Sequence, residues 1–210
     1  MNSNKNGKII ITICREYGSG GRQIGEEVAK RLDIPYYNRN LIDMVAKESG
    51  FASGYIDKFE EHVSSPLIWG IPMPRANMAF AGLAVQNYYS NEEKMFEAQS
   101  KIIRDIAKKG SCVIVGRCSN YILEQADIDS FDVFIKADIE KRAENVADRV
   151  ELKGDELIKF LQRRDHKRRV YYRFYTRRKW GDYHDYNMML DSGMIGKDKC
   201  VDMIISAIGE

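Results

Sequence analysis

The 210-residue sequence lacks several features that would assign it to a class at once. It has no apolar run of the ~20 residues that a membrane-spanning helix needs. Its four cysteines are scattered without a CxxC pair, which argues for reduced thiols and against a disulfide framework or a zinc site. The net charge is only +2, so the whole chain has no strong attraction for nucleic acid or membranes. Any anion binding must therefore come from local clusters of basic residues.

The first eight residues are polar and contain no apolar signal-peptide core, so we expect a cytoplasmic protein without membrane association. Hydrophobic residues make up 44% and charged residues 30% of the chain, which is ordinary for a folded protein. Its length suits one compact domain over residues 1–210. The composition leaves the oligomeric state open.

Short apolar runs rich in β-branched residues predict buried strands. The clearest are residues 9–14, 111–115 and 131–135, with weaker candidates at 34–37 and 186–190. Apolar residues at helical spacing separate these runs. Strands that alternate with helices predict an α/β fold, with a parallel sheet covered by helices on both faces.

Residues 51–89 break this alternation. Three of the four prolines, Pro66, Pro72 and Pro74, fall within nine residues there. We expect a small inserted lobe over 51–89, with one helix near 77–88. It would cap a binding site, form an oligomer contact, or be a surface excursion.

A glycine-rich segment follows the first predicted strand and opens the first predicted helix. It contains Gly18, Ser19, Gly20 and Gly21. This order directs backbone N–H groups and the positive end of the helix dipole toward one point, as in a phosphate cradle. A tight turn between strand and helix is the alternative. We favour phosphate binding by residues Gly18, Ser19, Gly20, Gly21, Arg22 and Gln23.

The segment departs from the phosphate-loop pattern GxxxxGK[ST]. Arg15 stands at the first glycine and Gly21 at the lysine, followed by Arg22 and Gln23, so both the lysine and the magnesium-binding Ser or Thr are absent. Arg22, one residue further on, is the candidate cation. An arginine is not equivalent to the missing lysine, but its longer side chain can bridge the offset.

Two further basic features have alternative readings. Arg117 follows a predicted strand and a glycine, so it would point into the ligand cleft at the carboxyl end of a parallel sheet, or else lie solvated on the surface. Residues 163–179 carry nine basic residues, one acid and interleaved aromatics. We expect an arginine-rich helical lid over 160–185; a solvated helix face or an RNA-binding helix would have the same composition.

The chain resembles the cytidylate-kinase-like branch of the P-loop nucleoside monophosphate kinases. The resemblance covers most of the length and rests on residues 13–22, 116–117, 131–137, 141–143, 171–176, 179–182 and 190–192. It implies a P-loop NTPase-type fold. It also implies that Arg117 binds the monophosphate and that Arg164 and Arg168 act on the transferred phosphoryl group. Cys118 stands where true cytidylate kinases have aspartate.

These observations predict ATP-dependent phosphoryl transfer to a nucleoside monophosphate, such as CMP, or to a similar small acceptor. Arg22, Arg164 and Arg168 would be catalytic, and Arg117 with Arg39 would hold the acceptor. ATP is the expected co-substrate, and Mg²⁺ is expected from the chemistry although no ligand for it is visible. The alternative is a nucleotide- or RNA-binding protein of the same fold that has lost catalysis.

Overall fold

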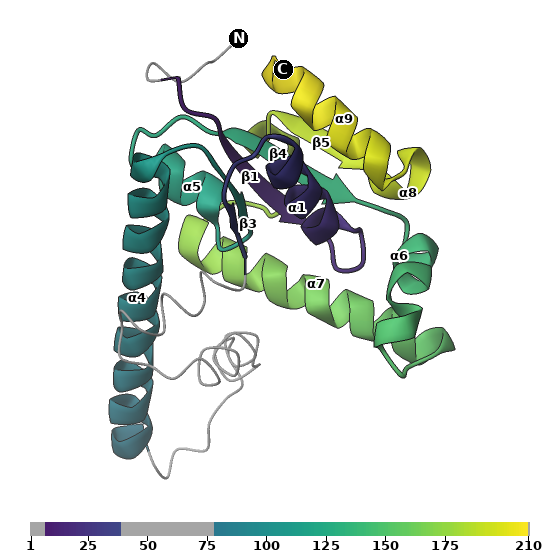
Figure 1. Ribbon diagram of the computed structural model, residues 1–210. Coiled ribbons are helices and arrows are strands. Elements are labelled where there is room, and N and C mark those ends of the chain that lie inside the picture. Colours follow the sequence, from purple (N-terminus) through teal and green to yellow (C-terminus); the bar gives the residue numbers. More distant parts are fainter. Residues whose placement is uncertain (1–6, 39–77, 210) are drawn as a thin grey trace.

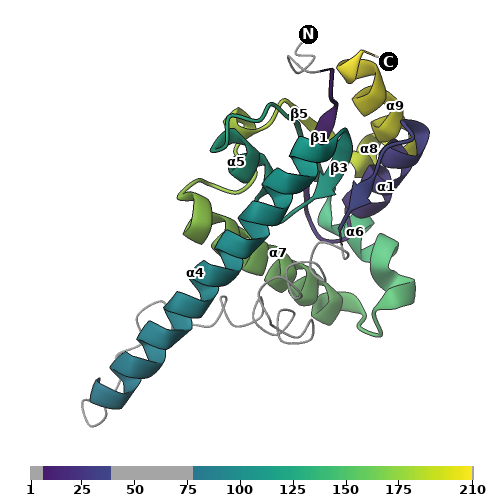
Figure 2. The same ribbon diagram turned by 60° about the vertical axis from the view of Figure 1, so that its left-hand side comes forward.

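The computed structural model describes residues 7–38 and 78–209, which form a parallel sheet with helices on both faces (Figures 1 and 2). The sheet has five strands in the order β2-β3-β1-β4-β5. The strands are β1 (Ile10–Arg15), β2 (Tyr36–Tyr37), β3 (Cys112–Val115), β4 (Phe131–Lys136) and β5 (Met188–Asp191). The predicted α/β fold class is therefore confirmed.

Strand β1 lies at the centre of the sheet and is buried on both faces. Ile11 and Ile13 are fully buried against α1 (Gly21–Arg31) and α9 (Lys197–Ile208). Ile10 points to the opposite face, because successive side chains of a strand alternate. That face is covered by α4 (Met78–Lys109), α5 (Ser119–Glu124) and α7 (Gly154–Thr176). Burial on both sides explains why the run is almost entirely apolar.

Short elements complete the connections between strands. They are α6 (Ile139–Val146), the 3-10 turns η3 (Ala147–Arg149) and η4 (Tyr183–Asp185), and α8 (Ser192–Ile195). The five predicted strands all exist, with bounds that shift by one or two residues. No helix among the described residues combines the length and the apolar character that crossing a bilayer requires.

The expected end of the inserted lobe at residue 89 falls inside a continuous helix, and the lobe itself stays a prediction. Helix α4 has 32 residues, from Met78 to Lys109, and its N-terminal half extends beyond the sheet (Figure 2). The sequence pattern suggests two separate helices here. The clear apolar stripe of Ile102, Ile103 and Ile106, which packs in the core, belongs only to the C-terminal half. The rest of the lobe lies outside the described residues.

All five strands run in the same direction, so their carboxyl ends meet at one edge of the sheet. Ile13 pairs with Val115 of β3 and with Val133 of β4. This register places Arg15 at the end of β1 beside the residues that follow Val115. Ligands of open parallel sheets bind at this edge.

Asp132 of β4 is a carboxylate held within this apolar framework. Its Oδ1 accepts hydrogen bonds from Thr12 Oγ1 at 2.5 Å and from Ser130 Oγ at 2.8 Å. Burial raises the pKa of Asp132 to about 6, from an ordinary value of 3.8, although both hydroxyl bonds oppose the rise. The folded protein therefore holds this proton more tightly than the unfolded chain does.

We predict that this carboxylate lowers stability as the pH rises from about 4 to about 6. In that window the unfolded chain has released the proton and the folded chain has not, so the free energy of unfolding falls. In the variant Asp132→Asn, the free energy of unfolding should no longer show this decrease between pH 4 and 6. The variant Asp105→Asn, at an exposed position of α4, should still show it. Urea unfolding between pH 4 and 8 measures both. If the free energy of unfolding changed with pH equally in Asp132→Asn and in the wild type, Asp132 would not be the group responsible.

Candidate phosphate-binding site

The glycine-rich segment forms the predicted loop between β1 and α1. Gly18 and Gly20 have φ values of 83° and 77°, in the left-handed region that glycine tolerates best. Helix α1 begins at Gly21, with no side-chain cap on Gly20 and no acidic residue in its first turn. The backbone N–H groups at this helix start are therefore not neutralised by a side chain of the loop or first turn. That arrangement suits an anion.

Other parts of the chain also require these glycines. A Cβ at Gly18 would lie 2.7 Å from the carbonyl oxygen of Arg142, and a Cβ at Gly20 would lie 2.7 Å from Cδ of Lys197. Lys197 Nζ also donates to Gln23 Oε1 at 2.9 Å. Lys197 is thus a cation at the loop that the sequence gives no reason to expect, because it lies far away at the start of α9.

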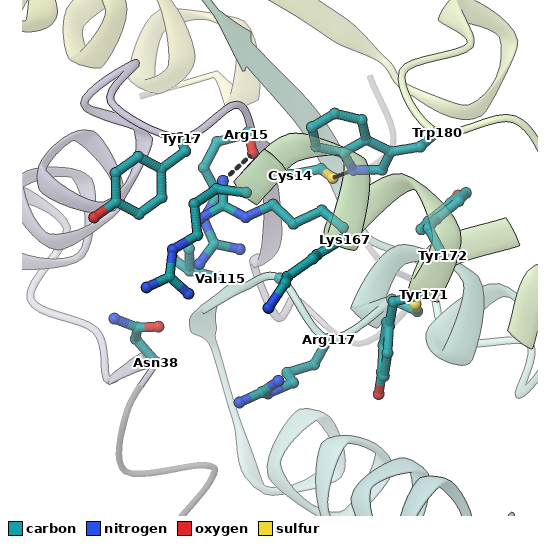
Figure 3. Close-up of a pocket in the computed structure, with 14 residues that line it drawn as sticks. Cys14, Arg15, Tyr17, Asn38, Val115, Arg117, Lys167, Tyr171, Tyr172 and Trp180 are labelled. Atoms are coloured by element: carbon teal, nitrogen blue, oxygen red, sulfur yellow. Dashed lines mark hydrogen bonds between the residues drawn. The ribbon is translucent and has the colours of Figure 1, made fainter. Parts of the chain in front are cut away.

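A cavity of about 500 Å³ opens beside the loop, a volume suited to a small ligand (Figure 3). It lies between the carboxyl ends of β1 and β3 and helix α7. The lining includes five basic residues and no carboxylate: Arg15, Arg117, Arg164, Lys167 and Arg168. The remaining lining residues are Cys14, Tyr17, Asn38, Val115, Gly116, Cys118, Tyr171, Tyr172 and Trp180.

Helix α7 is attached to the loop through the buried carboxylate of Asp165. This carboxylate accepts from the Tyr17 backbone N–H at 2.7 Å and from the Arg142 guanidinium of α6. One turn later, Arg168 Nη1 donates to the carbonyl oxygen of Arg15 at 2.7 Å. The predicted arginine-rich segment is therefore docked on the loop in this structure. Any opening and closing of that segment stays a prediction.

The turn after β3 holds Arg117 in an uncommon backbone conformation. Gly116, Arg117 and Cys118 have φ values of 83°, 60° and 54°. The side chain of the buried Gln99 fixes this turn, because its Nε2 donates to the carbonyl oxygen of Arg117 at 2.9 Å. Tyr171 in turn donates to Gln99 Oε1 at 3.2 Å. Such conformations cluster at functional sites.

The cavity disfavours further positive charge. Burial first, and then the charge of Arg15, lower the pKa of Arg168 to about 9, while Asp165 opposes the shift. Burial also lowers the pKa of Arg15, with the charges of Arg117 and Arg22 acting in the same direction. Burial raises the pKa of the Cys14 and Cys118 thiols, so they stay neutral and supply no counter-charge. A bound anion would offset the burial and mutual repulsion of these positive charges.

Three of the predicted site residues meet in this cavity, namely Arg117, Arg164 and Arg168. Arg164 also lies over the ring of Tyr17, 5.8 Å from its centroid. Arg22 is exposed on the first turn of α1 and does not line the cavity. Its catalytic role stays a prediction, as does phosphate binding by residues 18–23. Arg39 lies outside the described residues.

The described residues contain no group of three His, Cys, Asp or Glu side chains suited to a metal ion. Arg22 stands at the position of the usual Ser or Thr, and the side-chain oxygen of the next residue, Gln23, accepts a hydrogen bond from Lys197. These residues therefore do not fit the usual magnesium ligand of the loop.

We predict that Asp165→Ala destabilises the protein by about 3–5 kcal/mol, because it leaves the buried Arg142 guanidinium with only its longer ion pair to Glu16, at 3.6 Å. The Tyr17 N–H would lose its acceptor as well. Glu144→Ala, which removes an exposed ion pair with Lys141, is the control and should cost less than about 1 kcal/mol. Denaturant unfolding compares the two, and similar losses would show that Asp165 is no anchor.

The family model described as "Cytidylate kinase-like family" matches residues 10–194. A search of curated proteins returned no match. A crystal structure of an uncharacterized protein from Eubacterium ventriosum is 28% identical, with a TM-score of 0.70 over 96% of this chain and 98% of that one. Two shikimate kinase structures are similar to this chain in fold only. That from Bacteroides thetaiotaomicron is 13% identical, with a TM-score of 0.56 over 96% of this chain and 99% of that one. That from Acinetobacter baumannii is 10% identical, with a TM-score of 0.51 over 96% and 93%. The chain has the fold of P-loop kinases and belongs to the cytidylate kinase-like family.

Proposed function

We propose that this protein is an ATP-dependent kinase that transfers a phosphoryl group to a nucleoside monophosphate or a similar small phosphate compound. The observation that carries the proposal is the lining of the cavity, with five basic side chains and no carboxylate among the described residues. Membership in the cytidylate kinase-like family and the kinase fold support the same reaction class.

The lining favours a phosphate acceptor over an alcohol. A hydroxyl group must lose a proton as it attacks, which calls for a general base such as a carboxylate. A phosphate oxygen is already ionised at neutral pH, and it needs cations that reduce its repulsion from the donor phosphates. The described part of the cavity supplies cations and no carboxylate.

The loop and three of the basic residues have defined roles in this proposal. The uncapped start of α1 and the loop residues Gly18–Gln23 would bind the donor phosphates. Arg117, at the end of β3, would bind the acceptor phosphate. Arg164 and Arg168 approach from α7 and would stabilise negative charge during transfer. Asp165 acts as a positioning residue, because it attaches that helix to the loop.

The alternative is a nucleotide- or RNA-binding protein without catalysis. Its support is the loop, where Gly21 and Arg22 replace the lysine and the Ser or Thr of the usual pattern. In addition, Arg163, Arg169 and Arg173 are exposed on the outer side of α7. Turnover separates the two functions.

We predict ADP release when the purified chain is given ATP, Mg²⁺ and a panel of nucleoside monophosphates, and none with shikimate as a hydroxyl acceptor. Arg117→Ala should raise the KM of the best acceptor about 10- to 100-fold, the loss of one charge-assisted contact, and change the KM of ATP much less. A coupled ADP assay measures both constants. Binding of nucleotide without turnover of any monophosphate would favour the alternative.

A further inference from the structure

Arg15 and Gly21 have exchanged the residue types that a phosphate loop normally carries at their positions. In the pattern GxxxxGK[ST], the first position is glycine and the lysine follows six residues later. Here the first position is Arg15, and Gly21 stands at the lysine. From the sequence alone, the loop has lost the cation of its lysine. The packing of Arg15 and Gly21 indicates instead that the cation has moved to position 15.

The side chain of Arg15 runs through the space that a side chain at Gly21 would need. A Cβ built on Gly21 would lie 2.6 Å from Cβ and 2.9 Å from Cγ of Arg15. Real Cβ atoms do not approach other carbon atoms so closely. Arg15 and a lysine at position 21 therefore exclude each other in this backbone.

The guanidinium end of the Arg15 side chain packs against a second glycine, Gly116. A Cβ on Gly116 would lie 2.1 Å from Nη1 and 3.2 Å from Cζ of Arg15. Gly116 directly precedes Arg117, the expected acceptor-binding residue. The guanidinium thus reaches from the end of β1 to the end of β3, between the loop and Arg117. This is the place where donor and acceptor phosphates would meet.

No described carboxylate forms an ion pair with Arg15. Figure 3 shows Arg15, Lys167 and Arg117 directed toward the same space from β1, α7 and the turn after β3. A partly buried guanidinium among like charges is costly unless a counter-ion binds there. That no described carboxylate pairs with Arg15 is the second observation, and it is independent of the exchange of residue types.

We infer that Arg15 is the cation that binds the terminal phosphates of a nucleoside triphosphate, in place of the loop lysine. The inference rests on the proposed function, since it assigns a donor ligand to the same site. Arg15 approaches that ligand from the strand, whereas a lysine at position 21 would approach it from the helix. A guanidinium can also span two phosphate oxygens.

Arg22 is the competing candidate for this role. It lies nearer to the position of the lysine in the sequence, but it is exposed on α1 and does not line the cavity. Lys197 packs against Gly20 and already donates to Gln23. Of these three cations, only Arg15 lines the cavity.

The test uses inorganic tripolyphosphate, which carries the phosphate chain without a base, and isothermal titration calorimetry at fixed salt. Arg15→Met keeps most of the side-chain stem and removes the charge, so its affinity should fall about 10- to 100-fold. Arg15→Lys should retain part of the affinity. Arg31→Ala removes an arginine at the far end of α1 and should bind like the wild type. Wild-type affinity in Arg15→Met, or a loss confined to Arg22→Ala, would overturn the inference.

A residue exchange tests the mutual exclusion. Gly21→Lys alone should bind tripolyphosphate weakly or fold poorly, because its side chain meets the stem of Arg15. The double variant Arg15→Gly/Gly21→Lys should fold and regain most of the affinity. Circular dichroism reports folding for each variant. Full tripolyphosphate binding by the folded Gly21→Lys chain with Arg15 in place would overturn the inference.

These results are distinguishable from a failure of the proposed function. Tripolyphosphate binding requires no acceptor and no transfer. If the binding depends on Arg15 and no monophosphate is phosphorylated, the kinase activity fails and the phosphate-binding role of Arg15 stands. If turnover occurs and Arg15→Met leaves the KM of ATP unchanged, the inference fails and the kinase stands.

Discussion

A single buried carboxylate, that of Asp165, connects the parts of this site. It accepts the backbone N–H of Tyr17 in the loop and the guanidinium of Arg142 on α6, and it lies on α7 itself. Three segments that are distant in the sequence are thereby held at one edge of the sheet. Because Asp165 is occupied by these contacts and does not line the cavity, its charge anchors the structure while the cavity stays positive.

The parallel sheet supplies the other half of the arrangement. Strand β1 is buried on both faces at the centre, and β3 is its neighbour in register. Their carboxyl ends therefore bring Arg15 and Arg117 together. Helix α7 crosses this edge and adds Arg164, Lys167 and Arg168. The net charge of the chain is near zero, so the positive potential of the cavity is a product of the fold and not of the composition.

The features that the sequence predicts well are those encoded locally. Apolar runs predicted the strands, and the change from strand to glycines to helical spacing predicted the loop and the start of α1. Arg117 was predicted from its position after a strand, and Arg164 and Arg168 from the resemblance to the cytidylate-kinase-like branch; all three line the cavity. The sequence predicted a helix near 77–88 but not that it continues into the later helix with the apolar stripe of Ile103 and Ile106, because no local pattern joins the two.

The missed residues depend on contacts between distant segments. Lys167 is one cation among nine in its segment, and only its orientation separates it from those that face solvent. Lys197 meets the loop through the packing of α9 on α1. In the sequence Arg15 is visible only as a residue in place of the first glycine. No local pattern shows that a side chain at Gly21 or Gly116 would clash with that of Arg15.

This packing changes what the atypical loop implies. The glycines of a phosphate loop are usually attributed to the ligand, because they let the backbone approach phosphate. In this protein Gly21 and Gly116 also make room for an arginine, and Gly18 and Gly20 make room for Arg142 and Lys197. Because a side chain at position 21 would meet the stem of Arg15, the inferred role of Arg15 accounts for the glycine at that position. On this inference, the exchange of a glycine and a basic residue across the loop keeps a cation beside the phosphates.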